Sequence, residues 1–268
     1  MQYREFLPGD RLKHYVQCYF ICENNTPAVI EDKVFASGFV EIMFNLGESG
    51  PQKLMNGKLV SQPSIQLWGQ TIQPLSFSTT GKHTMLGVRF FTHTAACFFD
   101  EPIDTFNNHV VDFNDIAGRD ARLLYTKLLE ANTLAKRIEL VEEFLLARLT
   151  RFASRFGRLN MMNSIMHELN HEDFFENINS VAARYGLSSR YLQKLFVTYS
   201  GLSPNLFSKI SRFQKSLQLV AQKQLSLTAI AYDCGYYDQS HFIKDFTGSA
   251  PSHFHPESST DFAASLTS

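Results

Sequence analysis

An internal repeat in the last third of the chain constrains the fold more than any other feature of this 268-residue sequence. Residues 178–196 (INSVAARYGLSSRYLQKLF) align with residues 227–246 (LTAIAYDCGYYDQSHFIKDF), and the second copy has one extra residue in its turn. A G-x-x-P-x-x-F motif follows each copy, at 201–207 and at 248–254. The matching small and apolar residues are Ala182/Ala231, Gly186/Gly235, Leu192/Phe242 and Phe196/Phe246. Agreement at so many positions indicates a duplicated structural unit.

Each copy has the pattern of a helix-turn-helix. A small residue, Ala182 or Ala231, allows two helices to approach closely, and the glycine four residues later can adopt the left-handed conformation that ends a helix. Ser188 or Ser189 in the first copy and Asp238 in the second are candidate N-caps of the next helix. In that helix, apolar residues four positions apart predict an inward-facing side.

A long helix is predicted between the two copies. Ser203 is a suitable N-cap, and Pro204 after it suits the first helical position, so the helix extends to about Gln222. Its apolar stripe could pack against both units and fix their separation; it consists of Leu206, Phe207, Ile210, Phe213, Leu217 and Val220.

Local charge favours a nucleic-acid partner, although the whole chain has a net charge of -1. Residues 177–244 contain eight basic and two acidic residues, a local net charge of +6, which is a footprint suited to phosphate. Four acidic residues directly upstream offset part of it: Glu168, Glu172, Asp173 and Glu176. The second helix of each unit leaves Arg, Lys, Gln and Ser side chains outside, and such side chains contact base edges or phosphates in the major groove.

Residues 178–256 resemble the AraC/XylS family of bacterial transcription regulators. The resemblance rests on Ala182/Gly186/Ser188, Leu192/Phe196, Gly201/Ser203/Pro204, Arg212, Ile230/Ala231/Gly235/Tyr236, Ser240/Phe242 and Phe246/Gly248/Pro251. It implies two recognition helices that enter successive major-groove segments on one face of double-stranded DNA, a homodimer, and RNA polymerase as a partner. The candidate base contacts are Arg190, Gln193, Lys194, Gln239, Ser240 and Lys244, and the candidate backbone contacts are Ser188, Ser203, Lys209 and Arg212.

The second copy departs from the family pattern after Phe246. Gly248 follows Phe246 after one residue, whereas Gly201 follows Phe196 after four, so the second copy is three residues shorter there. This difference predicts a second recognition helix that lacks most of a turn and fits the groove less well. The chain also has Phe254-His255 where the family's final helix usually ends in an aromatic residue and Arg.

The first 110 or so residues are typical of a β-barrel or sandwich. Short apolar segments at 39–46, 64–70, 75–80 and 83–91 predict strands, and Asn56-Gly57 predicts a two-residue hairpin. Residues 38–48 (GFVEIMFNLGE) and 90–102 (FFTHTAACFFDEP) resemble segments of a poorly characterised type of the cupin-like sensor domains that precede AraC-type DNA-binding regions. Such a barrel could enclose a ligand pocket, and the aromatic and apolar residues that could line it or fill the core are Phe39, Met43, Phe44, Trp68, Phe77 and Phe90.

Helical periodicity replaces the strand pattern after about residue 112. Apolar residues from Ala121 to Leu149 recur three or four apart, with a break near Asn132-Thr133 that predicts two helices. The stripe from Leu134 to Leu149 could cover the barrel or form a homodimer seam. The arginines that follow, Arg148, Arg151, Arg155 and Arg158, suit a solvated helix face or a linker as well as DNA.

No motif for catalysis or for a metal cofactor is recognisable. The histidines of the first domain are isolated, with no H-x-H pair, and there is no G-x-S-x-G sequence and no phosphate-binding loop. The four cysteines lack metal-ligand spacing, which favours reduced thiols in a cytoplasmic protein. We expect neither secretion nor membrane insertion, because residues 1–10 form no apolar h-region and the sequence has no apolar span of membrane length.

The sequence therefore predicts a two-domain α+β protein. We expect a β-rich sensor or dimerisation domain at 1–150, a linker at 151–165, an all-α double helix-turn-helix domain at 166–258 and a flexible tail at 259–268. The favoured function is sequence-specific regulation of transcription, with an unidentified small-molecule effector and no enzymatic activity. Two alternatives remain: a cupin-like enzyme or carrier whose helix-turn-helix region no longer binds DNA, and a module whose basic helices bind an acidic protein.

Overall fold

The structure, a computed structural model, describes residues 2–25, 30–34, 36–47, 52–55, 58–73, 75–80, 82–152, 157–171, 178–222 and 224–249. The N-terminal half contains two antiparallel sheets. The larger has the order β1-β2-β9-β4-β7-β10, formed by Gln2–Phe6, Val16–Asn24, His83–Phe90, Glu41–Asn45, Ile65–Trp68 and Val110–Asp112. The smaller has the order β3-β8-β5-β6, formed by Ile30–Val34, Leu75–Thr80, Gln52–Met55 and Lys58–Ser61.

The strand predictions are confirmed in outline. Strands β4, β7, β8 and β9 lie within the four predicted segments, and β5 pairs with β6 with Met55 opposite Lys58, as a hairpin around Asn56-Gly57 requires. Asn56 and Gly57 themselves lie outside the described residues. The sequence patterns missed β1, β2, β3 and β10. In the described residues the strands form two open sheets, each with two edge strands, rather than a ring closed by pairing.

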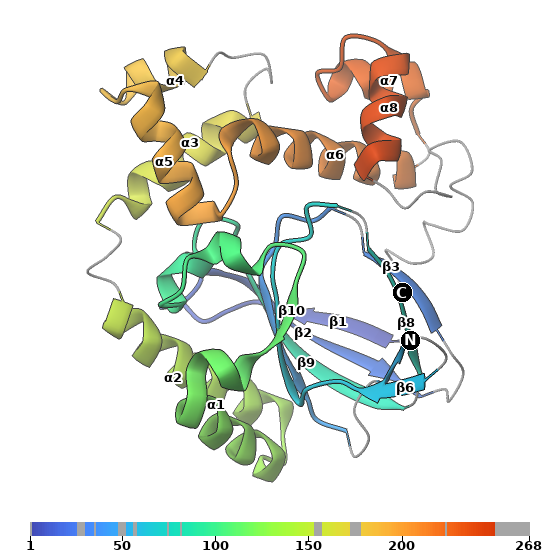
Figure 1. The fold of residues 1–268 in the computed structure, drawn as a ribbon, viewed down its shortest axis with the longest axis vertical. Helices are drawn as coiled ribbons and strands as arrows, with labels where there is room; N and C mark the ends of the chain where they lie inside the picture. Colours follow the sequence, from blue (N-terminus) through green and yellow to red (C-terminus); the bar gives the residue numbers. More distant parts are fainter. Residues whose placement is uncertain are drawn as a thin grey trace.

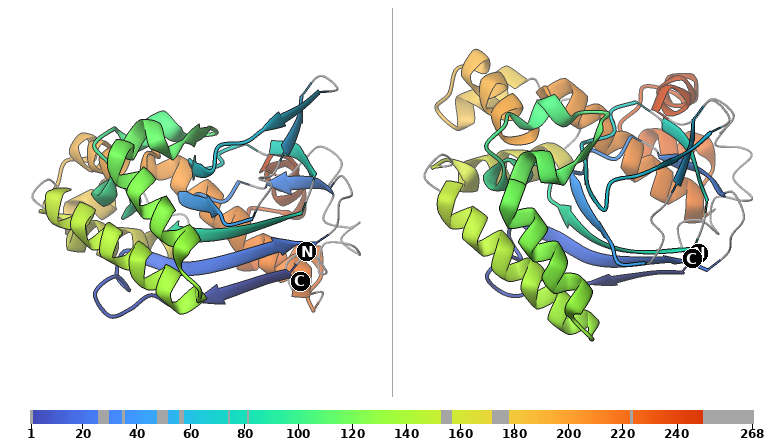
Figure 2. Two further views of the ribbon diagram at one scale, coloured as in Figure 1. Left: turned by 90° about the horizontal axis from the view of Figure 1, so that it is seen from below. Right: turned by 60° about the horizontal axis from the view of Figure 1, so that its bottom comes forward.

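Two helices cover one face of the larger sheet. Helix α1 (Phe113–Glu130) and helix α2 (Leu134–Phe152) are separated at the predicted break, and the Asp112 carboxylate caps α1 by accepting a hydrogen bond from the Asn114 N–H. Figure 2 shows the pair lying across the sheet. Val141 and Leu145 are fully buried in the core of this half, so the apolar stripe of α2 covers the sheet and is not free to form a dimer seam.

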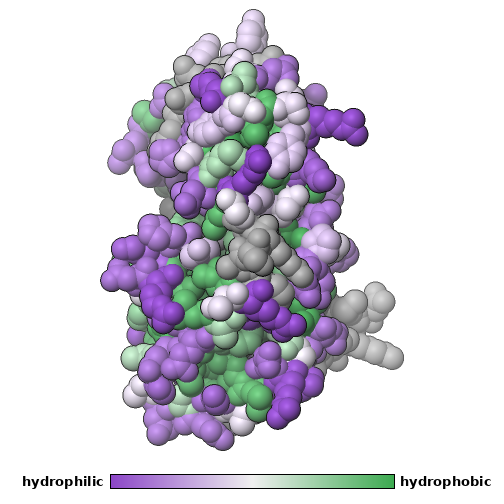
Figure 3. Space-filling view, turned by 90° about the vertical axis from the view of Figure 1, so that its left-hand side faces the viewer, coloured by the Kyte–Doolittle hydropathy of each residue, from purple (hydrophilic) through white to green (hydrophobic). Residues whose placement is uncertain are grey.

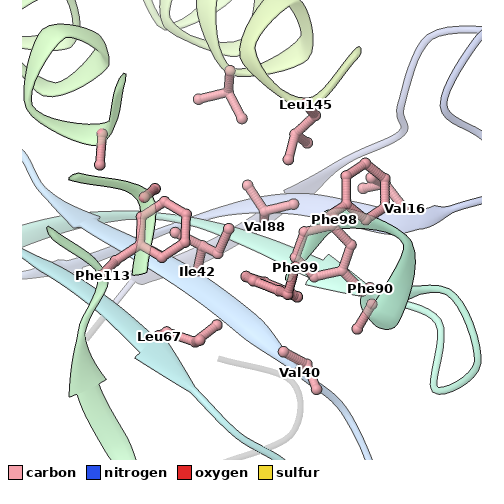
Figure 4. Packing of buried hydrophobic residues seen from close by; sticks show 14 of the residues in the cluster. Val16, Val40, Ile42, Leu67, Val88, Phe90, Phe98, Phe99, Phe113 and Leu145 are labelled. Atoms are coloured by element: carbon pink, nitrogen blue, oxygen red, sulfur yellow. The ribbon is translucent and has the colours of Figure 1, made fainter. Parts of the chain in front are cut away.

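The core between the sheet and these helices is rich in phenylalanine. Phe98 and Phe99 lie at and directly after the short helix η1 (Ala95–Phe98), and they meet Val88 from β9 and Leu145 from α2 (Figure 4). Arg148 is buried beside them, where its Nε donates to the Phe98 carbonyl oxygen at 2.6 Å. Burial lowers the pKa of Arg148, and its guanidinium contacts three phenylalanine rings, so this arginine belongs to the core rather than to a DNA surface.

The C-terminal half is entirely helical in the residues that the structure describes. Its helices are α3 (Leu159–His171), α4 (Ile178–Arg184), α5 (Ser189–Ser200), α6 (Pro204–Gln222), α7 (Leu227–Asp233) and α8 (Gln239–Ser249). Helix α6 has the predicted bounds, and helix α3 begins inside the segment 151–165, where a linker is expected from the sequence. The expected tail at 259–268 lies outside the described residues, as do Pro251, Phe254 and His255.

The two halves meet at the corner between α5 and α6. The end of α5 packs against η1 and against the second short helix η2 (Ile103–Phe106). The Gln70 side-chain amide donates to the Ser200 carbonyl oxygen, and Asn107 Nδ2 donates to the Gly201 carbonyl oxygen at 2.9 Å. Gly201 has a φ of 69°, and a Cβ there would lie 3.0 Å from the Asp104 nitrogen, so this close contact requires glycine.

Candidate nucleic-acid interface

Helices α4 and α5 (residues 178–200, called the first unit below) form a helix-turn-helix. The chain leaves α4 through Gly186, whose φ of 65° is the left-handed conformation predicted for it. Ser188, one of the two predicted N-caps, accepts a hydrogen bond from the Tyr191 N–H at 3.3 Å and so starts α5. Leu192 and Phe196 of α5 are fully buried, which leaves the opposite side of the helix exposed.

Helices α7 and α8 (residues 227–249, called the second unit below) repeat this arrangement. Gly235 has a φ of 71°, and the Asp238 carboxylate accepts a hydrogen bond from the His241 N–H at 2.7 Å, as expected for the N-cap of α8. Phe242 and Phe246 are fully buried and pack on each other with ring centres 5.3 Å apart. The prediction of a duplicated helix-turn-helix is therefore confirmed by matching backbone geometry.

Helix α6 connects the two units as a rigid spacer. Figure 1 shows the units at opposite ends of α6, on the same end of the molecule and away from α1 and α2. At about 1.5 Å per residue, 19 residues give a helix of about 28 Å, comparable to one turn of B-DNA, about 34 Å. Phe207 of α6 packs on Phe196 of the first unit, with ring centres 5.7 Å apart. Phe213 of α6 packs on Phe246 of the second unit, with ring centres 5.2 Å apart.

The candidate base-contact residues lie on the accessible sides of α5 and α8. Arg190, Gln193 and Lys194 are exposed along α5, and Ser240 and Lys244 are exposed along α8. Gln239 is only partly exposed, and its Oε1 accepts a hydrogen bond from Thr228 Oγ1 at 2.8 Å. The first domain therefore leaves the outer faces of both helices open.

The four candidate contacts to the DNA backbone differ in whether their polar groups already have partners within the protein. Ser188 and Ser203 are exposed N-caps whose hydroxyl oxygens accept backbone N–H groups, and each hydroxyl keeps a proton to donate. Lys209 Nζ lies 3.3 Å from the Asp245 carboxylate, and Arg212 lies 3.9 Å from the same group. The Arg212 guanidinium also lies 5.2 Å from the centre of the Tyr236 ring, so it packs between α6 and the second unit.

The positive footprint is smaller than the count of +6 suggests. Arg184 pairs with Glu168, Lys209 and Arg212 share Asp245, and Lys215 Nζ donates to the Asp233 carbonyl oxygen at 2.6 Å. Lys223 lies outside the described residues, as do Glu172, Asp173 and Glu176. Within the described part of this region, the basic side chains without an anionic or hydrogen-bond partner are Arg190, Lys194 and Lys244.

The second recognition helix is not shortened as predicted. Helix α8 has 11 residues and α5 has 12, because α8 continues through Gly248 to Ser249 instead of ending at the glycine. A glycine near the end of a helix costs only about 1 kcal/mol relative to alanine, so the helix can include it. Helix α8 is therefore one residue shorter than α5, not most of a turn shorter.

A cavity of about 320 Å³ lies between the two domains. It is lined by Ser37, Phe39 and Thr92 from the first domain and by Phe207, Ile210 and Gln214 from the second, among others. Of the residues expected to line a barrel pocket, Phe39 faces this cavity, whereas Phe44 and Phe90 are core residues and the side chain of Phe77 lies outside the described part. The sequence did not reveal the cavity because its walls come from two separate domains.

The described residues contain no group of three or more His, Cys, Asp or Glu that could hold a metal ion. Burial lowers the pKa of His93 to about 4, and its ring stacks on Phe91. Burial also raises the pKa of the Cys97 thiol to about 12. A neutral imidazole and a protonated thiol in apolar surroundings are structural groups.

Comparison with known proteins agrees with this geometry. Residues 181–255 match the family model described as "Helix-turn-helix domain", and residues 4–112 match one described as "Domain of unknown function (DUF6597)". The C-terminal region is therefore a helix-turn-helix domain, a class that binds DNA.

Within that class, the region is similar to part of known transcriptional activators. It is 33% identical over 89 residues to the HTH-type transcriptional activator RhaS of Escherichia coli (strain K12 / DH10B) and, to the same extent, to RhaS of Shigella boydii serotype 18. The match covers 32% of this chain and 30% of each RhaS, so the chain spans less than a third of the length of these relatives.

Two solved structures align with this chain. ToxT from Vibrio cholerae aligns over 100% of both chains with 12% identity and a TM-score of 0.49. A transcriptional regulator of the AraC-type DNA-binding class from Chromobacterium violaceum aligns over 40% of this chain and 88% of its own, with 21% identity and a TM-score of 0.32. In the part of the chain that the structure describes, no helix has the length and apolar character needed to cross a membrane.

Proposed function

We propose that this protein is a sequence-specific regulator of transcription that binds double-stranded DNA with both helix-turn-helix units. The observation that carries the proposal is the pair of capped helices, α5 and α8, which are held by α6 and keep their outer polar side chains accessible. A second helix of this kind fits the major groove, where its outer side chains reach base edges.

The roles of the individual residues follow from their chemistry and exposure. Arg190, Gln193 and Lys194 would contact bases in one major-groove segment, and Gln239, Ser240 and Lys244 would contact bases in the next. Ser188 and Ser203 would donate to phosphate oxygens from the ends of helices. Lys209 and Arg212 would reach phosphates only by releasing or sharing Asp245, so we assign them a weaker contribution.

The test is DNA binding by the full-length chain. Duplexes are selected from a random library, and affinity is then measured by fluorescence anisotropy at two salt concentrations against a scrambled duplex. We expect selection of a defined sequence and a loss of that preference in a double variant, Arg190→Ala with Lys194→Ala. Failure to select any sequence would favour a carrier or enzyme with an inactive helix-turn-helix region. Binding to acidic proteins but not to DNA would favour an interaction module.

The first domain would sense a signal or mediate dimerisation. We divide the chain into a cupin-like sensor domain at 1–150, a linker at 151–165, a DNA-binding domain at 166–258 and a tail at 259–268. Figure 3 shows apolar residues gathered on the lower part of one face, where α1 and α2 lie, and Leu123 and Leu129 of α1 are each 50% exposed. This surface supports a homodimer, which would bind DNA and contact RNA polymerase in the cytoplasm.

The effector site would be the interdomain cavity. Gly38 lines this cavity, and a Cβ atom added to it would lie 3.2 Å from Ile210 Cγ2, 3.9 Å from Gln70 Oε1 and 4.0 Å from Thr92 Oγ1. In the described residues, Gln70 Oε1 is buried without a hydrogen-bond partner. A small molecule in the cavity would contact both domains, and its binding would alter how α6 sits on the first domain.

A further inference from the structure

Backbone hydrogen bonds identify the extra residue in the second turn. The Leu187 N–H donates to the Ala182 carbonyl oxygen at 2.9 Å, and the Tyr236 N–H donates to the Ala231 carbonyl oxygen at 2.9 Å, so Leu187 and Tyr236 are equivalent. In the first unit the N-cap, Ser188, follows Leu187 directly. In the second unit one residue separates Tyr236 from the capping Asp238. That inserted residue is Tyr237.

The insertion places an aromatic side chain in solvent at the start of the recognition helix. Tyr237 is 81% exposed, and within the described residues it has no hydrogen bond and no ring contact. Its backbone is held on both sides, because Tyr236 is buried against Phe242 with ring centres 5.3 Å apart and Asp238 caps α8. A single exposed tyrosine is ordinary on a protein surface. This one lies at the end of α8 that a helix-turn-helix directs toward DNA.

The second unit also has little positive charge with which to hold DNA. The first unit contains Arg184, Arg190 and Lys194 and no acidic residue between positions 178 and 200. Between positions 227 and 249 the second unit contains one basic residue, Lys244, and three acidic ones, Asp233, Asp238 and Asp245. Contacts between this unit and the phosphate backbone therefore depend on uncharged donors, and a tyrosine hydroxyl is one that commonly serves at such interfaces.

We propose that Tyr237 is a DNA-backbone contact of the second unit, in which its hydroxyl donates to a phosphate oxygen and its ring packs on the adjoining deoxyribose. The proposal rests on the function proposed above and deepens it, since it assigns the two units different ways of holding DNA. The first unit uses cations, whose contribution falls steeply with salt. The second uses neutral contacts, whose contribution does not depend on counterion release.

The salt dependence of binding tests this assignment. Affinity for a duplex selected by the full-length chain is measured from 50 to 300 mM salt for the wild type, Tyr237→Phe, Tyr237→Ala and Lys194→Ala. A hydrogen bond to a charged group predicts about tenfold weaker binding for both Tyr237 variants at every salt concentration. The slope of log affinity against log salt should stay at the wild-type value for these two, whereas Lys194→Ala, as the loss of a base contact, should weaken binding to the selected duplex more than to a scrambled one.

Tyr232→Ala is the matched control, because Tyr232 is a second exposed tyrosine of the same unit, at 65%, but lies on α7. It should bind as the wild type does. Wild-type affinity in both Tyr237 variants would overturn the proposal, as would a reduced salt slope in either. Normal binding by Tyr237→Phe with loss only in Tyr237→Ala would overturn the donated hydrogen bond. A wild-type chain that selects no duplex would instead reject the proposed function itself.

Discussion

The two helix-turn-helix units have nearly the same backbone but different surroundings. The first is fixed to the N-terminal domain, because α5 packs on η1 and η2 and the residues at its end accept hydrogen bonds from Gln70 and Asn107. The second packs mainly on α6 through Phe213 and Phe246. Within the described residues, Arg190 and Lys194 of the first unit have no anionic or hydrogen-bond partner. Asp245 of the second unit instead holds Lys209 and Arg212 of α6, and Lys244 is the one cation of the second unit itself.

This difference shows that duplication preserved the fold and not the surface. The buried positions match because each unit must fill the same space between two helices and α6. The exposed positions are free to diverge, and here they leave one unit positively charged and attached to the N-terminal domain and the other with a net negative charge. A signal in the first domain would therefore reach the first unit directly and the second only through α6.

The largest effects should come from the matched core residues. Phe196→Ala and Phe246→Ala each remove a fully buried ring, which lowers the free energy of unfolding by about 3–5 kcal/mol. Because the first unit is also held by the N-terminal domain, Phe246→Ala should increase hydrogen exchange in α7 and α8 while α5 stays protected. Urea unfolding and hydrogen-exchange mass spectrometry measure both effects. Loss of protection in α5 as well would mean that the two units unfold together.

The next effect concerns base recognition by the first unit. Lys194 is exposed, and its ammonium has no partner among the residues that the structure describes. Lys194→Ala should therefore relax sequence preference and weaken binding by about 1–3 kcal/mol if the ammonium contacts a base. Lys244→Ala, its counterpart in the second unit, should weaken binding less because its unit has a net negative charge. Anisotropy titrations on matched and mismatched duplexes give both values. Equal losses would remove the distinction between the units.

The helix caps should give effects of intermediate size that are the same in both units. Ser188→Ala and Asp238→Ala each leave a backbone N–H of the first turn without its acceptor, which costs about 1 kcal/mol of stability. Thermal unfolding monitored by circular dichroism would register the shift, with Ser240→Ala as an exposed control that caps nothing. A much larger loss from Asp238→Ala would indicate that the inserted Tyr237 makes the second turn depend more on its cap.

The periodic parts of the fold could be predicted from the sequence, and the contacts between distant parts could not. Glycine, N-cap and apolar spacing predicted α5, α6 and the turn of each unit, because these depend on neighbours within a few residues. Strand β2 was missed because VQCYFICEN is apolar on both faces and lacks alternation. The hydrogen bonds of Gln70 and Asn107 were equally hidden, since an amide in a loop gives no sign of a partner more than 90 residues away.

The smallest expected effect comes from a substitution that makes the charge of the second unit more like that of the first. Asp245→Asn keeps the size of the side chain but removes the anion that holds Lys209 and Arg212, so both cations become available to phosphate. Because these ion pairs are partly solvated, the cost in stability should be within about 1 kcal/mol. Affinity for selected and scrambled duplexes should rise alike, by about threefold at low salt, with a steeper dependence on salt, since added phosphate contacts carry no sequence information.

Lys136→Ala, which breaks an exposed ion pair with Glu139 on α2, is the control and should leave binding unchanged. An unchanged salt slope in Asp245→Asn would mean that Lys209 and Arg212 face away from the DNA even when released, and their part would then be to fix α8 on α6.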